Sequence, residues 1–311
     1  GAYYNSAYNN TTTPVLIEGI FTATATTTYI GSDQNGTSVQ SALLDNVSVK
    51  EVTRDNVPRI DYTGGGCPHI LAEPQRTNYW TDSEGSSINL NSPLGEFGFY
   101  TLNNTFQSRI ITYAGTITFT FIVKKIDGTI PTIGTSSSSA DLVVYVNGGS
   151  SVGQSGVLTD IGNGFYKYKL TTSSSGSSVA RIQNNSGLDT YVSLIQYENS
   201  SYATSYIPTS GSTVTRNQDI FTRDGIGSLI NSTEGVLFVE MASFDNDVSY
   251  RYISLSDGTT NNKVMILYYL NNNTIRAIVS SGGSSVFDDT YAVSSLSDFH
   301  NIAIKWKAND F

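Results

Sequence analysis

The sequence predicts an all-β protein built from successive antiparallel β-sandwich or jelly-roll domains. Apolar and polar residues alternate with a period of two in many segments, and no stretch shows a convincing helical period of 3.6 residues. Only 14% of the 311 residues are charged, yet the chain has 20 tyrosines and 13 phenylalanines, which favours strands over disorder. Short strands separated by glycine-, asparagine- and serine-rich turns are typical of sandwiches and jelly rolls.

The strands follow from this alternation in chain order. In the segment 115–123, Ile117, Phe119, Phe121 and Val123 fall on one face, and threonines fall on the other. Further segments with strand character are 142–146, 164–170, 190–197, 236–241, 251–255, 264–270, 275–279 and 300–307. The turn signals between strands are Asn147-Gly-Gly, Gly162-Asn-Gly, Asp257-Gly and Ser281-Gly-Gly.

A weak internal repeat suggests where the domains divide. Residues 15–51 and 165–198 both run strand, Thr- or Ser-rich turn, strand and closing strand, but only the second is preceded by a full domain. The segment 55–76 is rich in proline and contains three consecutive glycines, which indicates an ordered linker. We therefore expect the C-terminal part of a truncated jelly roll over 1–54, a linker over 55–76, a complete jelly roll over 77–222, and the N-terminal part of a further, truncated sandwich over 223–311.

The charge and composition of the chain argue against several classes of partner. The net charge is −9, and no cluster of Lys and Arg is present, so neither nucleic acid nor an anionic membrane surface is expected as a partner. No apolar run approaches the roughly 18 residues that a spanning helix needs, so no membrane insertion is expected. Cys67 is the only cysteine, which excludes an intrachain disulfide and fits folding in a reducing cytoplasm.

The residues that catalysis requires are sparse. A Ser-His-Asp arrangement needs a histidine base, and the chain has only His69, in the linker beside Cys67, and His300, at the start of a predicted strand. Glycoside hydrolysis needs two carboxylates, but the acidic segment 240–247 lacks the Glu-x-Asp-x-x-Glu spacing of concanavalin-like glucanases. We therefore predict no enzyme activity. Acids that converge from different strands remain as the alternative, and they would make the chain a polysaccharide depolymerase.

No cofactor is predicted, and calcium is the one metal with candidate ligands. Asp245, Asp247 and Asp257 lie in or before predicted turns, where oxygen ligands of β-sandwiches often gather. Aspartate is also favoured in turns for backbone reasons, and no EF-hand loop pattern occurs. We therefore interpret them as solvated turn residues, with a calcium site as the alternative.

Aromatic residues supply the candidate glycan-binding surface. Sugars bind to flat aromatic faces flanked by a few hydrogen-bonding groups. Trp80, Tyr100 and Tyr145 are candidates for such faces, and Arg109 could bind sugar hydroxyls or a carboxylate. Core packing is the alternative for each aromatic residue, and it is favoured for Trp80 because tryptophan is usually mostly buried.

A second set of tyrosines is placed for contact between subunits. Tyr3, Tyr4, Tyr202 and Tyr206 lie in irregular stretches of the sequence. Protein interfaces are enriched in tyrosine and depleted in lysine and glutamate, as this chain is. We predict that these four residues contact neighbouring subunits.

Several motifs resemble those of one family. Arg59-Ile-Asp-Tyr, Glu73-Pro-Gln-Arg-Thr-Asn and the segment 196–216 are similar to stretches that flank the carbohydrate-binding module of bacteriophage virion proteins of the head-spike-fibre or tail-fibre type. Asp45-Asn-Val-Ser-Val-Lys-Glu resembles the end of a related jelly roll. Residues 234–311, with Arg251-Tyr-Ile-Ser-Leu-Ser-Asp-Gly, resemble the first part of a concanavalin-like (laminin-G-like) sandwich.

The resemblance implies a structural protein located in the virion. It implies a homotrimer that contacts other virion proteins and binds host surface polysaccharide without catalysis. The alternatives are the depolymerase considered above and an assembly protein that binds no glycan. Because fold does not determine function, the resemblance indicates architecture more directly than ligand.

Overall fold

The fold is all-β, as the alternation predicts. The computed structural model describes residues 58–62, 67–81, 88–89, 99–135, 140–146, 153–176, 178–184, 186–209, 211–244, 250–269 and 273–307. These residues form antiparallel sheets and one short 3-10 turn at Gly227–Leu229. The predicted jelly-roll fragment 1–54 lies outside the described residues.

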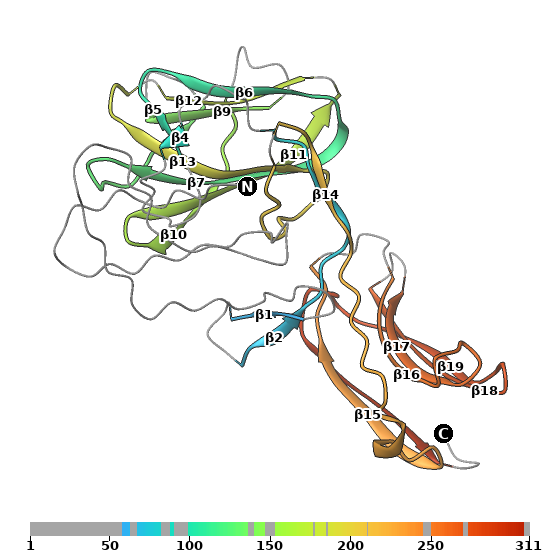
Figure 1. The fold of residues 1–311 in the computed structure, drawn as a ribbon. Helices are drawn as coiled ribbons and strands as arrows, with labels where there is room; N and C mark the ends of the chain where they lie inside the picture. The colour runs from blue at the N-terminus through green and yellow to red at the C-terminus, as the bar shows by residue number, and fades with distance from the viewer. Residues whose placement is uncertain are drawn as a thin grey trace, which may run out of the picture.

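The first sandwich packs a six-stranded sheet against a four-stranded sheet and forms the upper lobe of Figure 1. The six-stranded sheet has the order β10-β11-β7-β13-β5-β4, with bounds Val157–Gly162, Phe165–Ser175, Ala114–Lys125, Thr190–Glu198, Phe99–Leu102 and Ile88–Asn89. The four-stranded sheet has the order β6-β12-β9-β8, with bounds Phe106–Ile111, Ser178–Asn184, Leu142–Tyr145 and Ile133–Gly134. Neighbouring strands run antiparallel except β8 and β9.

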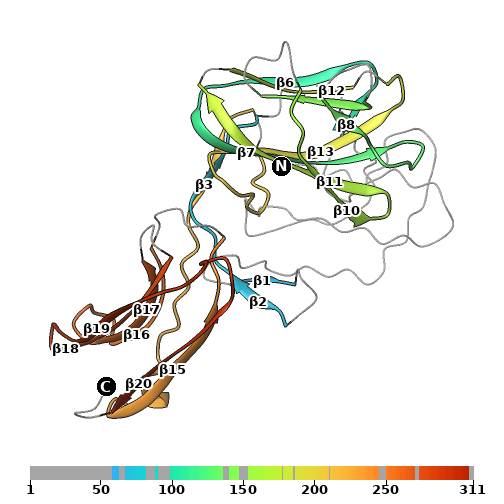
Figure 2. The same ribbon diagram turned by 180° about the vertical axis from the view of Figure 1, so that it is seen from behind.

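The second sandwich is smaller and forms the lower lobe, seen from behind in Figure 2. A two-stranded ribbon pairs β15 with β20, whose bounds are Glu234–Met241 and His300–Lys307. The ribbon faces a four-stranded sheet of order β16-β17-β18-β19, with bounds Arg251–Ser256, Lys263–Tyr269, Thr274–Ser281 and Ser284–Ala292. Each segment for which the alternation predicts a strand coincides with a strand of one of the two sandwiches, whereas β5, β10 and β19 are among the strands that lie outside the predicted segments.

Each sandwich has its own hydrophobic core. In the first, Phe119 and Phe121 on β7 are buried between the sheets, together with Ile182 on the opposite sheet. In the second, Ile304 and Trp306 on β20 pack against the inner face of the four-stranded sheet. Each fully buried apolar side chain stabilises the fold by about 1.5–3 kcal/mol, so the inward-facing residues of the alternating pattern determine both sandwiches.

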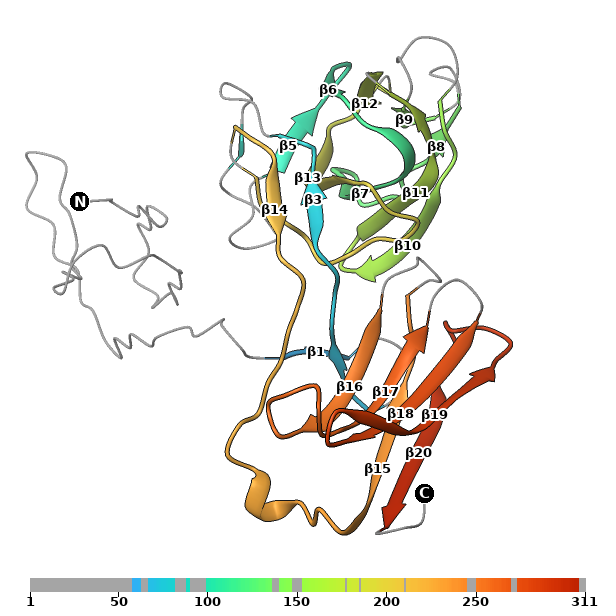
Figure 3. The same cartoon turned by 90° about the vertical axis from the view of Figure 1, so that its right-hand side faces the viewer.

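Short strands connect the two sandwiches. The hairpin of β1 (Arg59–Asp61) and β2 (His69–Leu71) falls in the predicted linker and lies beside the second sandwich, where the ring centroids of His69 and Phe299 are 5.4 Å apart. The chain then enters the first sandwich through β3 (Arg76–Asn78), which pairs with β14 (Val214–Arg216). Figure 3 shows the segments that lead into β3 and out of β14 running side by side between the lobes.

The predicted hairpin turns also form where the structure describes them. The turn from β10 to β11 has positive φ angles at Gly162, Asn163 and Gly164, of 90°, 54° and 76°. Two of these positions are glycine, which adopts positive φ without a steric penalty, and asparagine tolerates it better than most residues. The Gly-Asn-Gly sequence therefore sets this connection. The turn at Asn147 lies outside the described residues.

Candidate functional site

The structure corrects the predicted sugar contacts at Trp80 and Tyr100. Trp80 is 0% exposed, and its ring stacks on Phe119 with the centroids 5.4 Å apart. Tyr100, on β5, is 6% exposed and belongs to the same core. No sugar can reach a ring enclosed between the sheets, so both predictions of glycan contact are wrong and the core-packing alternative holds.

Arg109 and Tyr145 do not form a common site. Arg109, on β6, pairs with the buried Ala180, so it points toward the interior side of the four-stranded sheet. Its Nε donates to the carbonyl of Thr81, and its guanidinium lies 5.3 Å from the centre of the Trp80 ring. Arg109 therefore covers the edge of the core, whereas Tyr145 points to the opposite, outer face.

The outer face of the four-stranded sheet carries an aromatic and arginine cluster that the sequence analysis missed. Tyr145 on β9 lies opposite Arg181 on β12, and Arg181 lies opposite Ser108 on β6. The Arg181 guanidinium is 4.4 Å from the centre of the Phe106 ring, and Phe106 is 50% exposed. The alternation of Phe106, Ser108 and Ile110 marks this face in the sequence, but only the pairing of the strands places Arg181 and Tyr145 beside it.

The predicted subunit contact Tyr202 serves another purpose. Its side chain lies between the two sandwiches of one chain, where its ring stacks on Phe244 with the centroids 5.2 Å apart. Its hydroxyl accepts hydrogen bonds from Arg76 and Arg251 at 2.9 and 3.2 Å. Because Tyr202 is buried by its own chain, the prediction that it contacts a neighbouring subunit is wrong.

The other predicted subunit contacts remain predictions. Tyr206 is half-buried, and Tyr3 and Tyr4 lie outside the described residues.

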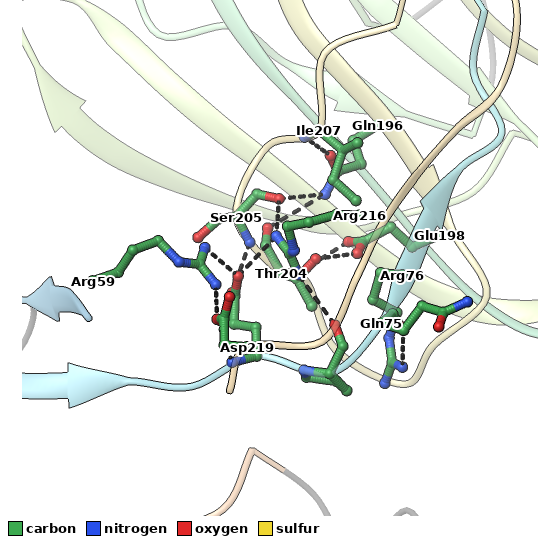
Figure 4. Close-up of polar contacts among 12 residues, drawn as sticks. Arg59, Gln75, Arg76, Gln196, Glu198, Thr204, Ser205, Ile207, Arg216 and Asp219 are labelled. Carbon is green, nitrogen blue, oxygen red and sulfur yellow. Dashed lines mark hydrogen bonds and ion pairs between the residues drawn. The ribbon is translucent and has the colours of Figure 1, made fainter. Parts of the chain in front are cut away.

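The densest polar cluster joins three of the motifs that carry the family resemblance (Figure 4). Glu73 Oε2 accepts from Nη1 of Arg59 at 2.6 Å and from Nη1 of Arg216 at 2.8 Å. Its Oε1 accepts from the backbone N–H of Ser205 at 2.8 Å. Arg59 also binds Asp219, which in turn accepts from the backbone N–H of Glu73. We call Arg59, Glu73, Ser205, Arg216 and Asp219 the junction.

Two buried amides continue the junction into the first sandwich. Asn78 donates to the carbonyls of Ile195 and Ile207 and accepts from the backbone N–H groups of Trp80 and Tyr197. Gln196 accepts from the backbone N–H of Ile207 at 2.5 Å and donates to the carbonyls of Thr204 and Ser205.

A buried acid holds the same loop. Glu198 accepts from both the backbone N–H and the hydroxyl of Thr204. The segment 199–209, which follows β13, is therefore held in place by hydrogen bonds to side chains rather than by strand pairing.

The electrostatics of the junction are those of a structural cluster. Burial lowers the pKa of the Arg216 guanidinium, which outweighs the attraction of Glu73. Burial also acts to lower the pKa of Arg59, but its hydrogen bonds to Asp219 and Glu73 outweigh burial and raise it. Both oxygens of Glu73 already accept hydrogen bonds within the chain. The carboxylate of Glu73 thus joins three different parts of the chain, at Arg59, Ser205 and Arg216.

The calcium candidates find no support in the described residues. Asp257 accepts hydrogen bonds from Thr259 and Asn262 within its own exposed turn. These bonds lower its pKa, as expected of a turn aspartate. No group of three or more His, Cys, Asp or Glu side chains in the described part of the chain could hold a metal ion. Asp245 and Asp247 lie outside it.

The sequence matches no protein-family model, and no curated protein matches it significantly. Among the described residues, no helix is long and apolar enough to cross a membrane.

Proposed function

We propose that this chain is a structural protein of a bacteriophage virion, such as a fibre, spike or decoration protein, which binds host surface glycans without catalysis. The observation that carries the proposal is the junction. The motifs that resemble those of virion proteins supply Arg59, Glu73, Ser205 and Arg216, and these residues tie the connecting segments to the first sandwich. Motif residues used in this way are expected of a protein that holds domains in a fixed arrangement.

Glycan contact is assigned to the outer face of the first sandwich. Phe106 and Tyr145 provide aromatic surface, and Arg181 between them provides hydrogen-bond donors. Such a surface binds sugars reversibly, by contact of C–H groups with the rings and by hydrogen bonds to hydroxyls. Display in a homotrimer would compensate for weak single-site affinity, because each further site binds at a high effective concentration.

A glycan array probed with the full chain tests this function, and any polysaccharide that binds is then assayed for release of new reducing ends. We expect binding without release, and Phe106→Ala should reduce it about tenfold, as the loss of an aromatic anchor does. Tyr62→Ala removes an exposed aromatic ring that lies outside both sandwiches and serves as the control.

Two other outcomes would replace the proposal. New reducing ends would make the chain a depolymerase. Absence of any binding would favour an assembly protein, for which Val236 and Phe238 on β15 are exposed apolar residues suited to subunit contact.

A further inference from the structure

The outer face of the four-stranded sheet in the second sandwich is unusually rich in tyrosine. Cross-strand pairing puts Tyr252, Leu267 and Arg276 side by side on this face, and Tyr269 and Tyr250 share the same alternation. Tyr250 and Tyr252 are 55% and 65% exposed. A solvent-facing sheet surface normally carries small polar or charged residues, so exposed tyrosines here require an explanation.

These side chains form one continuous surface. The Tyr250 and Tyr269 rings lie 5.9 Å apart, and the Arg276 guanidinium lies 5.0 Å from the centre of the Tyr269 ring. Leu267 lies on the same outer face, yet it is almost fully buried. Leu267 pairs directly with Tyr252 and Arg276, so their longer side chains flank it and shield it from solvent.

Hydrogen-bonding groups lie at the edge of the aromatic surface. Nε and Nη2 of Arg276 bind Oδ1 and Oδ2 of Asp288 at 2.7 and 2.6 Å. This bidentate pair fixes the position of both groups and uses two of the five guanidinium N–H donors. The hydrogen bonds to Asp288 raise the pKa of Arg276, so the pair stays charged but has no net charge. It can donate to and accept from sugar hydroxyls, and because its charges cancel it gives an acidic sugar no advantage over a neutral one.

We propose that Tyr250, Tyr252, Tyr269 and the Arg276–Asp288 pair form a second glycan-binding face, and that its ligand is a neutral polysaccharide. Exposed aromatic rings beside a fixed donor and acceptor are the chemistry that binds uncharged pyranose rings. The inference rests on the proposed function, because it assumes that the protein contacts glycans. The second face lies on the other sandwich and has a stated class of ligand, so each chain would have two glycan-binding sites.

Affinity electrophoresis of the full chain tests the proposal. The gels contain either a neutral polysaccharide (dextran, mannan or galactan) or an acidic one (polygalacturonate or hyaluronate). Tyr252→Ala removes the most exposed ring of the face, Phe106→Ala disables the face on the first sandwich, and Tyr62→Ala is the control because Tyr62 is an equally exposed tyrosine elsewhere, at 72%. Circular dichroism confirms that each variant folds.

We expect a neutral polysaccharide to retard the wild type, and Tyr252→Ala to weaken this binding about tenfold while Tyr62→Ala leaves it unchanged. Retardation that only Phe106→Ala reduces would overturn the inference and leave the proposed function standing. No retardation by any of the polysaccharides would overturn both. Retardation by the acidic polymers alone would overturn the neutral ligand, and dissociation of an oligomer by Tyr252→Ala would show that a second copy covers this face.

Discussion

At the scale of single residues, Asn78 shows how one buried amide can hold a loop onto a sandwich. Its side chain makes four hydrogen bonds, to the carbonyls of Ile195 and Ile207 and to the N–H groups of Trp80 and Tyr197. Asn78→Ala would leave several buried backbone groups unsatisfied, each at a cost of about 1–3 kcal/mol, so we expect the free energy of unfolding to fall by about 3 kcal/mol or more.

Urea unfolding followed by tryptophan fluorescence measures this loss. Asn103→Ala is the matched control, since the Asn103 amide binds Asp189 at the exposed surface. It should change the stability by less than about 0.5 kcal/mol. Equal stability of the two variants would contradict the role assigned to Asn78.

Tyr268 is expected to make the second sandwich less stable at alkaline pH. Its hydroxyl donates to the carbonyl of Met241 at 2.6 Å, and burial raises its pKa to about 12. Tyrosine in the unfolded chain ionises near pH 10, so this contribution to stability is complete below about pH 10 and is lost as the pH rises to about 12. Tyr268→Phe should cost about 1 kcal/mol at neutral pH and make the alkaline decline shallower.

Unfolding free energies measured across the alkaline range decide this prediction. Tyr62→Phe, at an exposed tyrosine, should reproduce the wild-type curve. If Tyr268→Phe also declines as steeply as the wild type, Tyr268 does not carry the pH dependence.

At the scale of elements, the ribbon of β15 and β20 requires glycine at position 235. Gly235 pairs with Trp306, and a Cβ atom at Gly235 would lie 2.2 Å from Cζ2 of the indole. Gly235→Ala must therefore displace the Trp306 ring from the second core, and overpacking of this kind costs about 1–3 kcal/mol.

In Gly235→Ala we expect the tryptophan fluorescence emission to shift to longer wavelength and the midpoint of unfolding to fall. Gly227→Ala is the control, since a Cβ there meets nothing within 4 Å. An unshifted emission spectrum in Gly235→Ala would mean that the ring accommodates the methyl group in place.

Many of the strands were predictable from the sequence because alternation is a local signal, and Phe119 and Phe121 lie in the core that their alternation predicts. The candidate binding face of the first sandwich was not predictable from the sequence, because it depends on which strands become neighbours. Phe106 and Arg181 are 75 positions apart in the chain and meet only through the pairing of β6 with β12. Tyr100 was wrongly named as a sugar contact because aromatic character does not say on which side of a sheet a ring lies, whereas Trp80 lies in the core, as the sequence favoured.

At the scale of the whole molecule, the junction determines how the two sandwiches are held together. Arg59 lies at the start of the hairpin beside the second sandwich, while Glu73 and Arg216 belong to the segments that enter and leave the first. The lobes also meet where Tyr202 stacks on Phe244 and accepts a hydrogen bond from Arg251. The relative position of the lobes therefore depends strongly on the charges at Glu73.

Glu73→Gln tests this dependence. The amide keeps the shape of the carboxylate but loses its charge, and its NH₂ group must face either the two arginines or the backbone N–H of Ser205, all of which are donors. Removing one partner of a buried ion pair costs about 3–5 kcal/mol. The junction belongs to neither hydrophobic core, so both sandwiches should stay folded while the connecting segments loosen. Small-angle X-ray scattering should then give a larger radius of gyration, and trypsin should cleave faster after Arg216.

Glu234→Gln, at an exposed position of β15, is the control and should change neither the radius of gyration nor the rate of cleavage. A scattering curve for Glu73→Gln that superimposes on that of the wild type would show that the lobes are held together without the junction.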